Sequence, residues 1–172
     1  MLIQLSSADE KLYKKLFTSC RDLEFAQYCL AVITKRGWHH AEFQKRGTVY
    51  LQQAAYTSAL FVSYGRAFTQ SRGWGELPPD VRCFSRTEAA CHKRMMHARN
   101  SVFAHTDSSE YTIQPWSSGD FTTDIVGAPI LRMSPEDAVL VDIMLPKCRA
   151  VMQKKMKSIL ARYGVTQKTD RR

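Results

Sequence analysis

"SADEKLYKKLFTSCRDLEFAQYCLAVITKRGW", residues 7–38, carries the helical pattern that decides the fold. Ser7 and Glu10 form a predicted capping box at its start, where a hydroxyl and a carboxylate bond the free N–H groups of a first turn. Apolar residues then recur at helical spacing: Leu12, Leu16, Leu23, Ala26, Leu30 and Ile33. The segment "KRGW" ends the pattern near Gly37. We therefore expect one long amphipathic helix over residues 8–36.

Three further segments repeat this pattern and predict helices over residues 41–70, 86–105 and 135–163. The first has an apolar stripe of Phe43, Tyr50, Leu51, Ala54, Phe61, Gly65 and Phe68; the second has Cys91, Met95, Ala98 and Val102; the third has Val141, Met144, Cys148, Met152, Met156, Ile159 and Tyr163. Capping boxes are expected at Ser85 with Glu88 and at Ser134 with Asp137. Pro146 is expected to kink the last helix.

These helices predict an all-α protein with a single domain over residues 1–172. The architecture expected is a four-to-five-helix antiparallel bundle with one long crossover connection. That connection, residues 106–133, is rich in Thr, Ser, Gly and Pro and has room for a small β-hairpin insert. A short basic tail, residues 164–172, follows the last helix.

The charge balance is the unusual feature of the composition. The chain has 25 Lys and Arg residues against 16 Asp and Glu residues, a formal net charge of +9. Such an excess attracts polyanions, so it favours nucleic acid or an anionic membrane as a partner, although a solvated basic surface without a partner explains it equally well. The five cysteines are scattered, and no apolar run is long enough to span a membrane. We expect a cytoplasmic protein that has no membrane association.

Metal and nucleotide sites are not expected. His92 and His97 are five residues apart and so lie on different faces of a helix, while His39 and His40 are adjacent and diverge. These histidines are predicted to lie on the surface. The chain has neither a GxGxxG nor a GxxxxGK[ST] loop, so no cofactor is predicted.

The segment "RNSVFAH", residues 99–105, ends the third predicted helix with two reactive side chains. Continuing the apolar stripe of that helix leads to His105, and the long Arg99 side chain is able to lean toward the same edge. A histidine at a helix C-terminus is also a common dipole-stabilising residue, so spacing alone leaves catalysis and capping both open.

This segment resembles the R-[polar]-x4-H signature of the HEPN superfamily, small all-helical proteins that include many metal-independent endoribonucleases of toxin and antiviral systems. Arg99 matches the arginine, Asn100 the polar residue and His105 the histidine. The chain differs from the subfamily whose toxin is silenced by adenylylation, because five residues separate Arg99 from His105 and Asp107 stands where a tyrosine is expected.

The resemblance implies an endoribonuclease in which the RNA 2′-OH is the nucleophile. His105 would then transfer protons, Arg99 would clamp the phosphate and Asn100 would orient it by a hydrogen bond, although Asn100 is equally well explained as a solvated residue. HEPN ribonucleases are usually homodimers with facing motifs, and a toxin of this kind has a cognate antitoxin protein as partner.

Further RNA-binding residues are expected on the same two helices. Lys93 and Arg94, one or two turns before the motif, and Arg66 on the neighbouring helix are predicted to contact RNA phosphates. Arg66 is also explained as an ion-paired or snorkelling residue. The alternative function is a non-catalytic helical module that binds nucleic acid or a partner protein through the same basic side chains.

Overall fold

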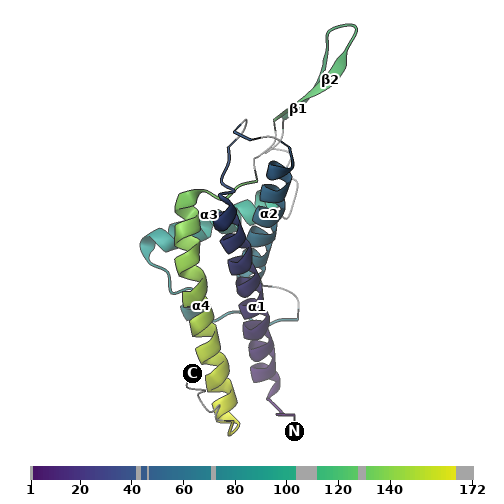
Figure 1. The fold of residues 1–172 in the computed structure, drawn as a ribbon. Coiled ribbons are helices and arrows are strands. Elements are labelled where there is room, and N and C mark those ends of the chain that lie inside the picture. Colours follow the sequence, from purple (N-terminus) through teal and green to yellow (C-terminus); the bar gives the residue numbers. More distant parts are fainter. Residues whose placement is uncertain are drawn as a thin grey trace.

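The chain folds into a helical bundle with a β-hairpin beyond one end (Figure 1). The computed structural model describes residues 2–41, 44–45, 47–70, 73–103, 112–127 and 131–165. In these ranges the helices are α1 (Ser7–Arg36), α2 (Thr48–Phe68), α3 (Arg86–Ala98) and α4 (Pro135–Arg162). A short 3₁₀ turn, η1 (Pro79–Val81), precedes α3, and a π-helical turn, η2 (Arg99–Phe103), follows it. The all-α class with a small β insert is confirmed.

Helix α1 is the centre of the bundle because it packs along both α2 and α4. Figure 1 shows that α2 and α4 run antiparallel to it. The start of α1 and the end of α4 are joined by side chains: the Ser6 N–H donates to the Tyr163 hydroxyl at 2.9 Å, that hydroxyl donates to Asp9 at 2.8 Å, and Arg162 also pairs with Asp9. The shorter α3 contacts α2 and α4.

The core includes the inward-facing stripes that the sequence predicts on α1 and α4, together with buried residues of α2 and α3. Fully buried members include Leu16, Leu23, Ala26 and Ile33 from α1 and Val141, Met144 and Met152 from α4. Four cysteines are buried as free thiols, whereas Cys83 is exposed. The thiols therefore pack as small apolar groups.

Two helix starts differ from the sequence prediction. Ser6, rather than Ser7, caps α1, and its hydroxyl accepts the Asp9 N–H at 3.3 Å. Helix α2 begins at Thr48 instead of residue 41, because Gly47 precedes it with φ +62° and thus breaks any helix entering from upstream. The stripe predicted for this helix is consequently wrong at its start: Leu51 is 72% exposed. Phe43 lies outside the described residues.

The caps of α3 and α4 follow the prediction more closely. Ser85 and Glu88 form the full capping box of α3. Ser134 caps α4 by accepting the Asp137 N–H at 3.1 Å, but the Asp137 carboxylate pairs with Arg94 of α3. Helix α4 continues through Pro146 and ends at Arg162.

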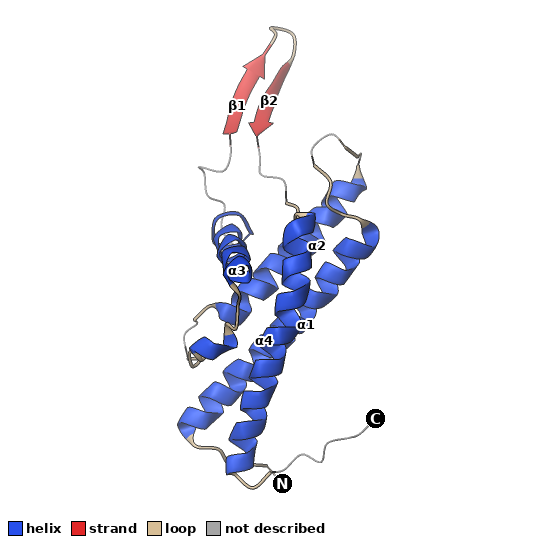
Figure 2. Ribbon diagram, turned by 90° about the vertical axis from the view of Figure 1, so that its left-hand side faces the viewer, coloured by secondary structure: helices blue, strands red, loops and turns tan. Residues whose placement is uncertain are grey.

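The hairpin lies in the predicted crossover (Figure 2). Strands β1 (Thr112–Ser117) and β2 (Thr122–Gly127) pair antiparallel, with Trp116 opposite Thr123. The small β-hairpin insert is thus confirmed. Across the described part of the chain, no helix has the length and apolar character that a membrane crossing requires.

Candidate functional site

The α-helical geometry of α3 stops where the "RNSVFAH" segment begins. Residues Arg99–Phe103 form the π-helical turn η2, in which each N–H bonds five residues back and the turn holds an extra residue. A count in steps of three and four along α3 assumes an unbroken α-helix. The placement of His105 stays a prediction, because that residue lies outside the described residues.

Arg99 packs across α2 at Gly65. A β-carbon at Gly65 would lie 2.5 Å from Cγ and 2.9 Å from Cδ of Arg99, so the missing side chain makes the space in which Arg99 lies. Arg99 Nη1 donates to Asn100 Oδ1 at 2.9 Å. Its Nε is buried and has no hydrogen-bond partner among the described residues. The aliphatic part of Arg99 is thus fixed in place, while its guanidinium keeps unused donor capacity.

Arg99 and Arg66, predicted from two separate helices, line one pocket of about 260 Å³. The other lining residues are Lys15, Thr18 and Asp22 from α1, Thr69 at the end of α2, and Trp74. An adjoining pocket of about 290 Å³ shares Lys15 and Thr69 with it. The first pocket has three cationic side chains against one carboxylate and so favours an anion.

The charges in this pocket are partly desolvated. Arg66 pairs with Asp22 at 3.1 Å, which agrees with the ion-paired interpretation of Arg66. Burial raises the pKa of Asp22, and Arg66 and Lys15 oppose that shift. Burial also lowers the pKa of Lys15, and Asp22 opposes it. Lys15 Nζ donates to the carbonyls of Thr69 at 2.9 Å and Arg66 at 3.4 Å, so it also satisfies carbonyls at the C-terminal end of α2.

The other predicted binding residues lie outside the pocket lining. Arg94 is exposed and bonds both carboxylate oxygens of Asp137. Lys93 is exposed on α3. Lys15 is only 5% exposed, and it was not identified from the sequence. A lysine next to Leu16, at the edge of an apolar stripe, is normally expected to be a solvent-exposed residue.

Of the four histidines predicted to lie on the surface, His97 is exposed as expected, whereas His39, His40 and His92 are half-buried. The His92 ring packs 4.9 Å from Phe68 and 5.0 Å from Phe84, centroid to centroid, and hydrogen-bonds the Tyr64 hydroxyl at 2.8 Å. Burial lowers the pKa of His92 to about 4, with a smaller contribution from Arg82. Its role is therefore structural. The described residues contain no cluster of three His, Cys, Asp or Glu side chains that would hold a metal.

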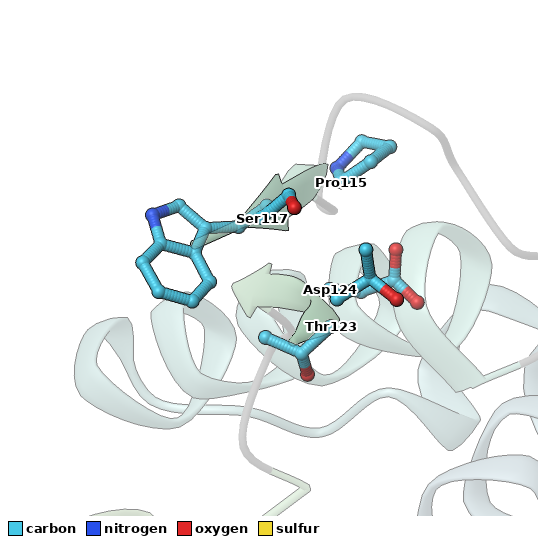
Figure 3. A pocket seen from close by; sticks show the side chains of 6 residues that line it. Pro115, Ser117, Thr123 and Asp124 are labelled. Carbon is cyan, nitrogen blue, oxygen red and sulfur yellow. The ribbon is translucent and has the colours of Figure 1, made fainter. Parts of the chain in front are cut away.

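A third hollow, of about 320 Å³, lies on the hairpin (Figure 3). It is lined by Pro115, Trp116 and Ser117 of β1 and Thr122, Thr123 and Asp124 of β2. Asp124 is its one ionisable residue, so the hollow has no cation to bind a phosphate. The pocket at Arg99 is the better candidate.

The Arg99 pocket is suited to holding a phosphate group. Guanidinium groups donate in a planar fork that matches two phosphate oxygens, and burial of Lys15 and Arg99 Nε strengthens their interaction with a bound anion. Proton transfer near neutral pH would need a further group, since Asp22 is the sole acid in the lining. No family model, curated protein or solved structure matches this chain.

Proposed function

We propose that this chain is a metal-independent endoribonuclease of the HEPN type, which holds an RNA phosphate in the Arg99 pocket. The observation that carries the proposal is the position of Arg99. The arginine of the motif lies across Gly65, beside Arg66, in a pocket with an excess of positive charge. A group that holds a phosphate must have a fixed position and hydrogen-bond donors that are free to bind the phosphate oxygens.

The proposed reaction is transesterification within the RNA. The 2′-oxygen attacks the adjacent phosphorus and loses its proton to a base, while the 5′-oxygen of the next nucleotide leaves and takes up a proton. The products are a 2′,3′-cyclic phosphate and a free 5′-hydroxyl. Arg99 stabilises the charge that develops on the phosphorane oxygens, and Asn100 positions Arg99 through its 2.9 Å hydrogen bond. His105 is proposed for proton transfer on the strength of the motif.

The single histidine of the motif does not supply both the base and the acid. We therefore include in the proposal a homodimer in which two motifs share one groove, so that each copy contributes an arginine and a histidine. The basic surface, with Lys93 and Arg94 among its residues, is proposed to guide RNA toward that groove. A cytoplasmic toxin with a cognate antitoxin is the proposed biological setting.

Incubation of the full-length protein with end-labelled single-stranded RNA and with DNA of the same sequence, in EDTA, tests the proposal. We expect RNA cleavage with 2′,3′-cyclic phosphate ends and intact DNA, because DNA lacks the 2′-OH. Arg99→Ala should slow cleavage by about 10²–10³-fold, and His105→Ala by about 10²–10⁴-fold.

Arg86→Ala is the matched control, because Arg86 is an exposed arginine at the start of the same helix and lies outside the pocket lining. Its rate should stay within a few-fold of wild type. Cleavage that requires Mg²⁺, or that persists in the His105→Ala variant, would contradict the proposed site. RNA that is bound but returned intact by the wild-type protein would favour the non-catalytic binding module instead.

A further inference from the structure

The outward face of α1 exposes three large aromatic side chains. Phe17 is 52% exposed, Phe25 is 51% exposed and Tyr28 is 59% exposed. The opposite face of the same helix is buried against α2 and α4 through Leu16, Leu23 and the residues that repeat with them. Clustered exposed aromatics on one helix face are typical of a surface that binds another protein.

Two of these aromatics belong to a regular seam along the whole of α1. Its members are spaced alternately by four and three residues, and all of them are exposed: Glu10, Lys14, Phe17, Arg21, Glu24, Tyr28, Ala31 and Lys35. Alternating steps of four and three keep a stripe in line with a facing helix, as in coiled-coil packing. The seam is long enough to run against a second helix from its first turn to its last.

The seam is complementary to itself when the second helix is antiparallel. A two-fold axis between residues 22 and 23 places Phe17 opposite Tyr28 of the second copy and Arg21 opposite Glu24 of the second copy. The same axis places Glu10 opposite Lys35 and Lys14 opposite the small Ala31. A parallel arrangement would instead bring each charge against its own like charge. We propose that the two copies of the homodimer meet through an antiparallel α1–α1 seam.

This dimer would bring the two Arg99 pockets onto one face, a consequence that rests on the proposed function. Thr18 and Asp22, which line the pocket, each follow a seam residue by one position and so flank the seam on one side. A two-fold axis perpendicular to two antiparallel helices leaves the same flank of each copy on the same side. The pocket residues of α1 centre about four residues from the axis, or about 6 Å along the helix. One RNA strand would then meet both pockets.

The oligomeric state without RNA tests the seam directly. Sedimentation velocity should show a dimer for the wild-type chain and a shift toward monomer for Phe17→Glu, because a charge replaces an aromatic group at the interface. Leu51→Glu is the matched control, since Leu51 is a 72% exposed residue of α2 and is not a member of the seam. A wild-type monomer, or a dimer that Phe17→Glu leaves intact while circular dichroism shows native helicity, would overturn the inference.

Disulfide crosslinking fixes the direction of the helices. In a Cys83→Ser background, Phe17→Cys mixed with Tyr28→Cys should yield a covalent dimer on mild oxidation, whereas either variant alone should not. Phe17 of the two copies would be eleven residues apart along the seam, about 16 Å, which is too far for a disulfide. Efficient crosslinking of Phe17→Cys to itself would mean a parallel seam. A dimer with the expected crosslinks but no RNA cleavage would refute the proposed function and leave the seam standing.

Discussion

Arg99 occupies the space that a side chain at Gly65 would need. The two residues come from different helices, and an ideal β-carbon at Gly65 would lie within 2.5 Å of Arg99 Cγ. Glycine in a helix interior costs about 1 kcal/mol relative to alanine. The helix tolerates that cost at a position where the bare backbone lets an arginine cross, so Gly65 is best understood as part of the pocket.

Gly65→Ala should therefore weaken RNA binding and also lower the stability of the fold. The new methyl group displaces the Arg99 side chain, while the better helix propensity of alanine offsets part of the strain. We expect RNA affinity at fixed salt to fall by roughly 10-fold, as measured by fluorescence anisotropy. Gly75→Ala is the control, because a β-carbon there has no contact closer than 3.8 Å. Unchanged affinity in Gly65→Ala would argue against the pocket as the phosphate site.

RNA binding should weaken steeply as salt rises, because bound cationic side chains release counterions from the phosphates. For single-stranded RNA, loss of one phosphate contact reduces the slope of log K against log salt by about 0.7. Arg66→Ala and Arg99→Ala should each produce a reduction of this size in a salt titration, and Arg86→Ala should leave the slope unchanged. Equal slopes in all three variants would show that Arg66 and Arg99 do not contact phosphate.

Stability should fall between pH 7 and pH 5 because of His92. Its pKa is about 4 in the folded protein, against an ordinary value of 6.5, since the ring is buried among aromatic side chains. The unfolded chain binds the proton first, so the stabilisation present above pH 6.5 is lost progressively toward pH 4. The loss at pH 5 should be at most about 2 kcal/mol.

Urea unfolding at the two pH values measures this effect. His92→Gln should be less stable than wild type at pH 7 but should show a smaller change on going to pH 5. His97→Gln, at an exposed position of the same helix, should keep the wild-type pH dependence. A His92→Gln variant that is as pH-sensitive as wild type would show that other groups carry the effect.

Glu88→Ala should destabilise the bundle at neutral pH. The Glu88 carboxylate accepts the Ser85 N–H at 2.7 Å and pairs with Lys147 of α4, so it both caps α3 and ties it to α4. We expect a loss of about 1–2 kcal/mol in thermal or urea unfolding.

The Lys147 hydrogen bond, followed by the Ser85 N–H, holds the pKa of Glu88 below its ordinary value of 4.5. The stabilisation is therefore present above pH 4.5, and the difference between wild type and Glu88→Ala should shrink as the pH falls below it. Glu136→Ala removes an exposed first-turn carboxylate from α4 and should cost less than half as much. Equal losses of unfolding free energy in the two variants would show that the Glu88–Lys147 ion pair does not contribute to stability.

Features determined by neighbouring residues could be predicted from the sequence. The Ser85–Glu88 capping box and the stripes of α1 and α4 depend on spacings within a few turns, and the structure confirms them. The start of α2 could not be predicted, because it depends on the backbone angles of Gly47. The π-helical turn at Arg99 was also not predicted, because a count in steps of three and four assumes an unbroken α-helix.

The candidate site was partly predictable for a related reason. Arg66 and Arg99 could be named from the sequence, but their meeting in one pocket depends on how α2 and α3 cross. Lys15 joins them from α1, and its burial follows from the carbonyls at the end of α2, which no local pattern reveals.

The pocket draws its lining from parts of the chain that are far apart, including Lys15, Arg66 and Arg99, so it exists only when the chain is folded. An anion held there binds the native state and not the unfolded state, and mass action then raises the free energy of unfolding. At a concentration one hundred times its Kd, such a ligand adds about 2.7 kcal/mol. The melting temperature thus reports how much of the pocket is occupied. Short oligonucleotides and inorganic phosphate can be ranked by their affinity for the pocket without any assay of cleavage.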